Sequence, residues 1–268
     1  IAGREAFSRY DIEKLPLPAS LHDDLRDRPA IYRREQEIWR DLPEDVWRRA
    51  LACYYGRITE IDGQVGRLLD ALDETGQRDN TLVIFTGDHG RYLGAHGLDA
   101  HNFGAFEEAY NIPMIIAGPG VAAGAVTNAR VGIHDLCPTI CELTGREQLG
   151  LPDSRSFAPL LASPRLVEDD YREGYAEYHG TRFRLTQRVY WEGKWKYVFN
   201  GFDYDELYNL EEDPYEMQNL AGRSEYADVV RRMMQGVWRR VRETGDDTLL
   251  NTHYYSMRLA VVGPGSGG

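Results

Sequence analysis

The chain has 268 residues, of which 42% are hydrophobic and 28% are charged, and its formal net charge is -12. This length predicts one large or two modest domains with enough apolar residues for a buried core. The acidic balance argues against nucleic acid or an anionic membrane surface as a partner, because both attract basic patches. No run approaches the roughly 20 apolar residues of a membrane span. The three cysteines include no Cys-x-x-Cys pair, which argues against a disulfide framework or a structural zinc site.

The first 43 residues predict an extended arm, because prolines and charges interrupt every apolar pattern except one short helix near 32–40. A long amphipathic helix follows from Pro43 to Gly76. Glu44 and Asp45 suit the positive end of its dipole. Its apolar stripe recurs at steps of three and four residues, at Leu51, Tyr54, Ile58, Ile61, Val65, Leu68 and Leu72.

Two short apolar runs, 81–86 and 113–117, predict buried strands, and Asp135 precedes a helix that runs to Thr144. The alternation of strands with helices is typical of an α/β domain with a mostly parallel sheet. We therefore expect residues 44–161 to form part of such a domain.

From residue 162 onward the pattern changes to short, alternating aromatic strands at 175–178, 189–191 and 195–199. A tight turn at 192–194 joins the last two strands. A helix over 224–243 completes the predicted antiparallel subdomain at 162–250, and residues 251–268 read as a tail.

Asp88 and His89 stand directly after the first strand, where chemistry collects in α/β sheets. A carboxylate beside an imidazole suits a divalent cation such as Ca²⁺, Mn²⁺, Mg²⁺ or Zn²⁺. The alternative interpretation is a capping Asp and a loop His that is satisfied by the backbone.

The loop that follows carries His96, Asp99, His101 and Asn102, each of which is either a further ligand, an anion-binding group or a solvated loop residue. For each one singly we expect the solvated state, with His101 as the preferred exception. Glu107 and Glu108 are expected to brace the second strand. No Gly-x-Ser-x-Gly elbow, Walker loop or Gly-x-Gly-x-x-Gly motif is present.

The order of these motifs resembles the sulfatase family. Thr-Gly-Asp-His-Gly at 86–90 resembles the metal loop of that family, and Glu-Leu-Tyr-Asn-Leu-Glu-Glu-Asp-Pro at 206–214 resembles a segment of its C-terminal part. The segments that carry the resemblance are residues 54–72, 79–90, 93–97, 106–116, 118–120, 135–139, 193–197 and 206–214.

The resemblance implies an alkaline-phosphatase-like α/β fold with a small C-terminal antiparallel sheet and helix. It also implies hydrolysis of small-molecule sulfate esters around one divalent cation, with Ca²⁺ first and Mn²⁺ or Mg²⁺ as alternatives. Asp88 and His89 match the second pair of metal-binding positions of the family. The resemblance further implies a formylglycine nucleophile, made from Cys or Ser in a C/S-x-P-x-R motif.

The sequence departs from the family pattern at two places, the nucleophile motif and a lysine position. The formylglycine motif is absent, since Tyr55 stands where Cys53 and Arg57 would need a proline between them. The family also places a Lys shortly after the Asp-His pair, whereas here His101 stands near that position as a possible anion-binding group. The first residue is Ile1 rather than Met, so we expect a C-terminal part of a longer sulfatase, inactive without its N-terminal half.

Two other functions stay open at this point. One is a phosphonate monoester hydrolase or phosphodiesterase of the same superfamily, and the other is a non-catalytic binding module derived from a sulfatase. We also expect self-association, because part of an α/β sheet would expose apolar strand edges and faces.

Overall fold

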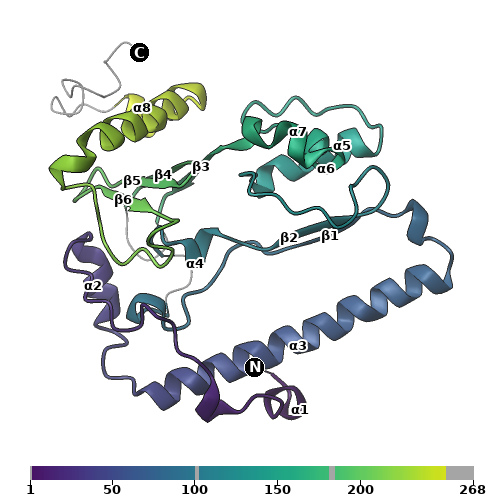
Figure 1. Ribbon diagram of the computed structural model, residues 1–268, viewed down its shortest axis with the longest axis horizontal. Coiled ribbons are helices and arrows are strands. Elements are labelled where there is room, and N and C mark those ends of the chain that lie inside the picture. Colours follow the sequence, from purple (N-terminus) through teal and green to yellow (C-terminus); the bar gives the residue numbers. More distant parts are fainter. Residues whose placement is uncertain (1, 100–102, 181–184, 252–268) are drawn as a thin grey trace. The chain divides into compact units, whose positions relative to one another are not determined.

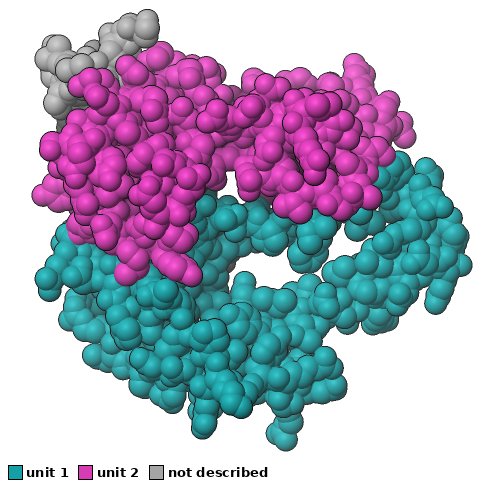
Figure 2. All heavy atoms as spheres, viewed as in Figure 1, with its two compact units in different colours: residues 1–26, 30–119 teal, residues 27–29, 120–268 magenta. Residues whose placement is uncertain are grey.

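The chain folds into two compact units in the computed structural model, which describes residues 2–99, 103–180 and 185–251. The first unit comprises residues 1–26 and 30–119, and the second comprises residues 27–29 and 120–268 (Figure 2). The α/β class expected from the sequence is confirmed, since helices and strands both occur in each unit.

The first unit combines one long helix with short helical turns and a two-stranded ribbon (Figure 1). Its helices and strands are α1 Arg4–Phe7, α2 Ala30–Gln36, α3 Glu44–Glu74, β1 Val83–Thr86, α4 Glu107–Tyr110 and β2 Met114–Ala117. The expected arm therefore contains two short helices, of which α2 overlaps the predicted one.

Helix α3 begins and ends where the sequence predicts, with Pro43 before it and Gly76 just after it in the left-handed region at φ 66°. Only its first half is buried, at Trp47, Leu51, Ala52 and Gly56. Gly56 lies against α1, since an added Cβ would meet the backbone of Ala6 and Phe7 at 3.0–3.2 Å. In the later part of the apolar stripe Ile58, Ile61 and Leu68 are 42–68% exposed, and Val65 and Leu72 are half-buried.

The strands β1 and β2 pair antiparallel, with Val83 opposite Ala117 and Thr86 opposite Met114. The prediction that these two strands belong to a parallel sheet is therefore wrong for this pair. The chain leaves β1 at Thr86 and enters β2 at the same end of the ribbon. A parallel pair would need a crossover connection that carries the chain back to the other end, and this segment makes none. The ribbon is also less buried than expected, since Phe85 is 38% and Ile115 63% exposed.

The second unit is built around a four-stranded antiparallel sheet in the order β3-β4-β5-β6. Its helices and strands are α5 Leu136–Leu143, α6 Ala158–Ala162, α7 Pro164–Val167, β3 Glu173–Tyr178, β4 Gln187–Glu192, β5 Trp195–Phe199, β6 Glu206–Asn209, α8 Ala227–Glu243 and α9 Asp247–Leu250. The predicted hairpin turn is confirmed, with Gly193 at φ 56° between β4 and β5.

Helix α8 lies across one face of this sheet (Figure 1) and supplies much of its core. Met233, Val237 and Val241 are fully buried there. Gly236 permits the close approach, because a Cβ at this position would overlap the ring of Tyr190 on β4. The predicted antiparallel sheet and its helix are therefore confirmed.

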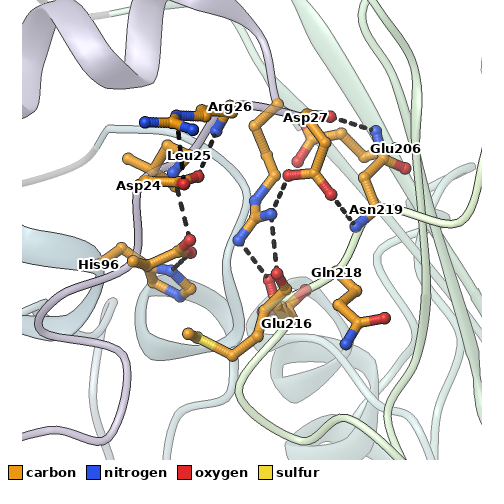
Figure 3. Close-up of polar contacts among 12 residues, drawn as sticks. Asp24, Leu25, Arg26, Asp27, His96, Glu206, Glu216, Gln218 and Asn219 are labelled. Carbon is orange, nitrogen blue, oxygen red and sulfur yellow. Dashed lines mark hydrogen bonds and ion pairs between the residues drawn. The ribbon is translucent and has the colours of Figure 1, made fainter.

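Residues Asp27–Pro29 belong to the second unit although their sequence neighbours belong to the first. The Arg28 side chain is buried and donates to the carbonyl oxygens of Met217 at 2.9 Å and Glu216 at 3.1 Å. Asp27 accepts a hydrogen bond from the backbone N–H of Asn219 at 2.9 Å (Figure 3). These contacts anchor a piece of the N-terminal arm in the C-terminal subdomain.

All three cysteines are free. Within the described ranges, no helix combines the length with the apolar character that crossing a bilayer requires.

Candidate metal centre

The Asp-His pair occupies the loop that begins where β1 ends at Thr86. Gly90 closes this loop by donating its N–H to the carbonyl oxygen of Ala109, at 2.9 Å. A Cβ at Gly90 would overlap the carbonyl oxygen of Glu108, so only glycine fits in this place. The loop is thereby held against the segment that precedes β2.

His89 is oriented by the carbonyl oxygen of Gly90, which lies 2.9 Å from Nδ1. A carbonyl oxygen can only accept, so Nδ1 carries the proton and, in the neutral ring, the lone pair is on Nε2. This is the arrangement in which metal-binding histidines are commonly held, with one ring nitrogen donating to a carbonyl and the other left to bind the metal.

The Asp88 carboxylate lies on the Nε2 side of that ring, with Oδ2 at 3.6 Å from Nε2 of His89. Its other oxygen, Oδ1, accepts a hydrogen bond from the backbone N–H of His89 at 3.0 Å. The carboxylate is 86% and the imidazole 29% exposed, so the pair is open to solvent.

These two donors fit a divalent cation, because both lie within reach of a single ion at the usual ligand distances of about 2.0–2.6 Å. They do not make a complete set. Over the described part of the chain, no group of three or more His, Cys, Asp or Glu side chains is placed to hold a metal. Further ligands would have to come from elsewhere.

Arg91 follows the loop directly and forms a two-point ion pair with Asp99, with Nε–Oδ1 and Nη2–Oδ2 both at 2.9 Å. The hydrogen bonds to Asp99 raise the pKa of the guanidinium. Asp99 is thus engaged with Arg91 rather than with the Asp-His pair.

His101, expected near the lysine position of the family, lies outside the described residues, and its anion-binding role stays a prediction. His96 is described, and the expectation of a solvated loop residue is wrong for it. Its side chain is fully buried, with Nδ1 at 2.8 Å from Oδ2 of Asp23. The sequence offered no local signal for this, because Asp23 is 73 residues away.

Gly90 is the site residue whose importance the sequence analysis missed. Its position after Asp88 and His89 was visible, but the need for glycine arises only from the approach of Glu108.

Two family models match the chain. One is described as "Sulfatase" and matches residues 15–146, and the other as "N-sulphoglucosamine sulphohydrolase, C-terminal" and matches residues 94–243.

Individual relatives agree with these matches. A choline-sulfatase of Rhizobium meliloti is 36% identical over 68% of this chain and 35% of its own length. The multifunctional alkaline phosphatase superfamily protein PehA of Trinickia caryophylli is 35% identical over 90% of this chain and 49% of its own length. The solved phosphonate monoester hydrolase of Silicibacter pomeroyi has a TM-score of 0.79 and 26% identity over 90% of this chain and 53% of that one. The chain thus spans a third to a half of the length of these relatives.

Proposed function

The chain belongs to the sulfatase family, and on this premise we propose that it is the C-terminal part of a hydrolase that cleaves small-molecule sulfate esters with one divalent cation. Asp88 and His89 would supply two of the ligands. Ca²⁺ is the first choice, with Mn²⁺ or Mg²⁺ as alternatives. The observation that carries the proposal is the orientation of the His89 ring, whose Nδ1 donates to Gly90 at 2.9 Å while Nε2 faces Asp88 at 3.6 Å.

When bound, such a cation would polarise an ester oxygen and offset the negative charge that develops in the transition state. The residues of this chain would orient the ligand atoms and supply negative charge next to the cation. The Gly90 carbonyl keeps the proton of His89 on Nδ1, and the Asp88 carboxylate supplies a hard oxygen donor. The nucleophile, expected as a formylglycine, would come from another part of the parent protein.

The metal-binding step can be tested on this chain with Mn²⁺ as the probe. We expect substoichiometric Mn²⁺ to broaden the NMR signals of the His89 ring selectively, since a paramagnetic ion acts on nearby nuclei. Asp88→Asn should remove most of this broadening, and Asp79→Asn, at an exposed carboxylate before β1, should not. Equal broadening in both variants would argue against the pair as ligands.

The catalytic step needs the parent protein. We expect the parent to hydrolyse an aryl sulfate, and Asp88→Asn to lower kcat/KM by at least about 100-fold, since even changes around metal ligands cost about 10–100-fold. The 268-residue chain by itself should be inactive, and turnover by the purified chain would contradict this part of the proposal. A parent without turnover would favour the non-catalytic binding module.

A phosphonate ester is the second candidate substrate. It is favoured by the likeness to the Silicibacter pomeroyi phosphonate monoester hydrolase and by the match to the multifunctional relative over 90% of the chain. The ratio of kcat/KM values for sulfate and phosphonate monoesters of the same alcohol, measured on the parent, separates the two candidates.

We also propose that the remaining part of the parent covers apolar side chains left exposed on the first unit. Ile58, Ile61 and Leu68 of α3 are 42–68% exposed, and Ile115 of β2 is 63% exposed. Gly63 on the same helix has no described atom within 4 Å of an added Cβ. The chain alone should therefore self-associate, which light scattering after size exclusion would detect. A monomer at all concentrations would count against this proposal.

A further inference from the structure

His96 adopts a strained backbone conformation at φ 54° and ψ 23°, which is uncommon outside glycine. Three contacts hold it there. Its N–H donates to Oγ of Ser20 at 3.1 Å, and its carbonyl accepts from Nε2 of Gln36 at 2.8 Å. Its ring stacks on Phe106, with centroids 3.8 Å apart and planes 13° apart. The position of the imidazole is therefore set by contacts from several segments.

Each ring nitrogen of His96 faces a carboxylate. Nδ1 is 2.8 Å from Oδ2 of Asp23, and Nε2 is 3.8 Å from Oε2 of Glu108. Among the described residues, neither this Nε2 nor this Oε2 has a hydrogen-bond partner, although both atoms are buried. A buried polar atom without a partner is unfavourable, so a small approach that joins the two atoms would stabilise the fold.

Glu108 connects this buried pair to the metal loop through its backbone. Its carbonyl oxygen fills the space in which Gly90 would carry a Cβ, and the next carbonyl, of Ala109, accepts the Gly90 N–H at 2.9 Å. The Gly90 carbonyl in turn accepts from Nδ1 of His89. A continuous series of contacts therefore runs from Asp23 through His96 and Glu108 to the ring of His89.

We propose that His96 is a positioning residue: by holding Glu108 and stacking on Phe106, it keeps residues 106–109 against Gly90 and so sets the direction of the His89 ring. In this role His96 acts through Glu108 and Phe106 and is not itself a ligand. The proposal rests on the proposed function only in one respect, namely that the oriented His89 ring would bind a metal. The coupling between His96 and Gly90 is a property of the folded chain.

The test is amide hydrogen exchange by NMR on the full chain without metal or substrate. In His96→Gln we expect the Gly90 amide to exchange at least about tenfold faster, while buried amides of α3 such as Leu51 keep their rates. Glu108→Gln, which keeps the shape of the side chain, should show a smaller increase at Gly90. His22→Gln is the matched control, because its side chain is 79% exposed in the same unit.

The ¹⁵N signals of the His89 ring give a second readout that loss of stability alone would not move. We expect the Nδ1–H tautomer to dominate in the unmodified chain and in His22→Gln, and a mixture of tautomers in His96→Gln. Unchanged Gly90 exchange and an unchanged tautomer in His96→Gln would overturn the proposal. So would an equal rise at all amides of the first unit. Because neither readout uses turnover, the coupling would stand even if the parent failed to cleave sulfate esters.

Discussion

Replacement of Gly90 by alanine tests the clamp on the metal loop most directly. The new Cβ would overlap the carbonyl oxygen of Glu108 and would lie 2.9 Å from its carbonyl carbon and 3.4 Å from Cα of Ala109. These are backbone atoms and cannot rotate away, so the loop and the 108–109 segment must separate. The hydrogen bond from the Gly90 N–H to Ala109, 2.9 Å long, would be lost with them.

The expected cost combines two effects. A lost hydrogen bond is worth about 1 kcal/mol and overpacking about 1–3 kcal/mol, so the first unit should lose about 2–4 kcal/mol. Native-state hydrogen exchange reports the two units separately, which matters because a chain of two units need not unfold in one step. The amides around the metal loop should exchange roughly 30- to 1000-fold faster.

Gly87→Ala is the matched control, because Gly87 lies three residues before Gly90, on the other side of Asp88 and His89. Its Cβ would meet only the carbonyl oxygen of His89 at 3.8 Å and Cδ of Pro113 at 4.0 Å, which are ordinary contacts. Neither glycine has a φ in the left-handed range, so backbone strain affects neither change. We expect Gly87→Ala to be neutral or to stabilise by up to about 1 kcal/mol. If Gly90→Ala behaved like Gly87→Ala, the reasoning about the clamp would be refuted.

Three further predictions concern the second unit. Gly236→Ala should destabilise it by about 1–3 kcal/mol in urea unfolding, because the new methyl would overlap the Tyr190 ring, whereas Gly222→Ala, with no described atom within 4 Å, should not. Burial raises the pKa of Tyr190 to about 12, so the neutral phenol contributes stability that is complete below pH 10 and is lost between pH 10 and 12. Tyr190→Phe should remove the part of the stability loss that Tyr190 causes between pH 10 and 12. An unchanged dependence of stability on pH would contradict the role given to Tyr190. Lys196→Met should cost about 3–5 kcal/mol, because it removes the cation that lies 2.7 Å from the equally buried carboxylate of Glu216. Adding Glu216→Gln should recover part of this cost, and strictly additive effects would show that the two side chains are not coupled.

The elements that the sequence predicted well are those whose limits are set by neighbouring residues. Pro43 and Gly76 bound α3 because of their own backbone preferences, and Gly193 marks the turn between β4 and β5 for the same reason. The Asp-His pair after β1 was recognisable because both residues are adjacent in the chain and follow a short apolar run.

The depth of burial was harder to predict, because it depends on what packs against a face. Periodicity showed that α3 has an apolar stripe, yet only Trp47, Leu51 and Ala52 are buried, together with Gly56 where α1 packs. The periodicity is the same along the helix, so the sequence pattern alone does not tell the covered half from the exposed one.

The sequence by itself determined the α/β class, the sulfatase resemblance and the place of Asp88 and His89 directly after the first strand. Only the tertiary structure decided the antiparallel pairing of β1 with β2 and the burial of His96 against Asp23. It also decided that position 90 must be glycine. The physical reason is distance along the chain: hydrogen bonds and steric contacts between residues 18 to 73 positions apart depend on how the chain closes on itself, which no local preference encodes.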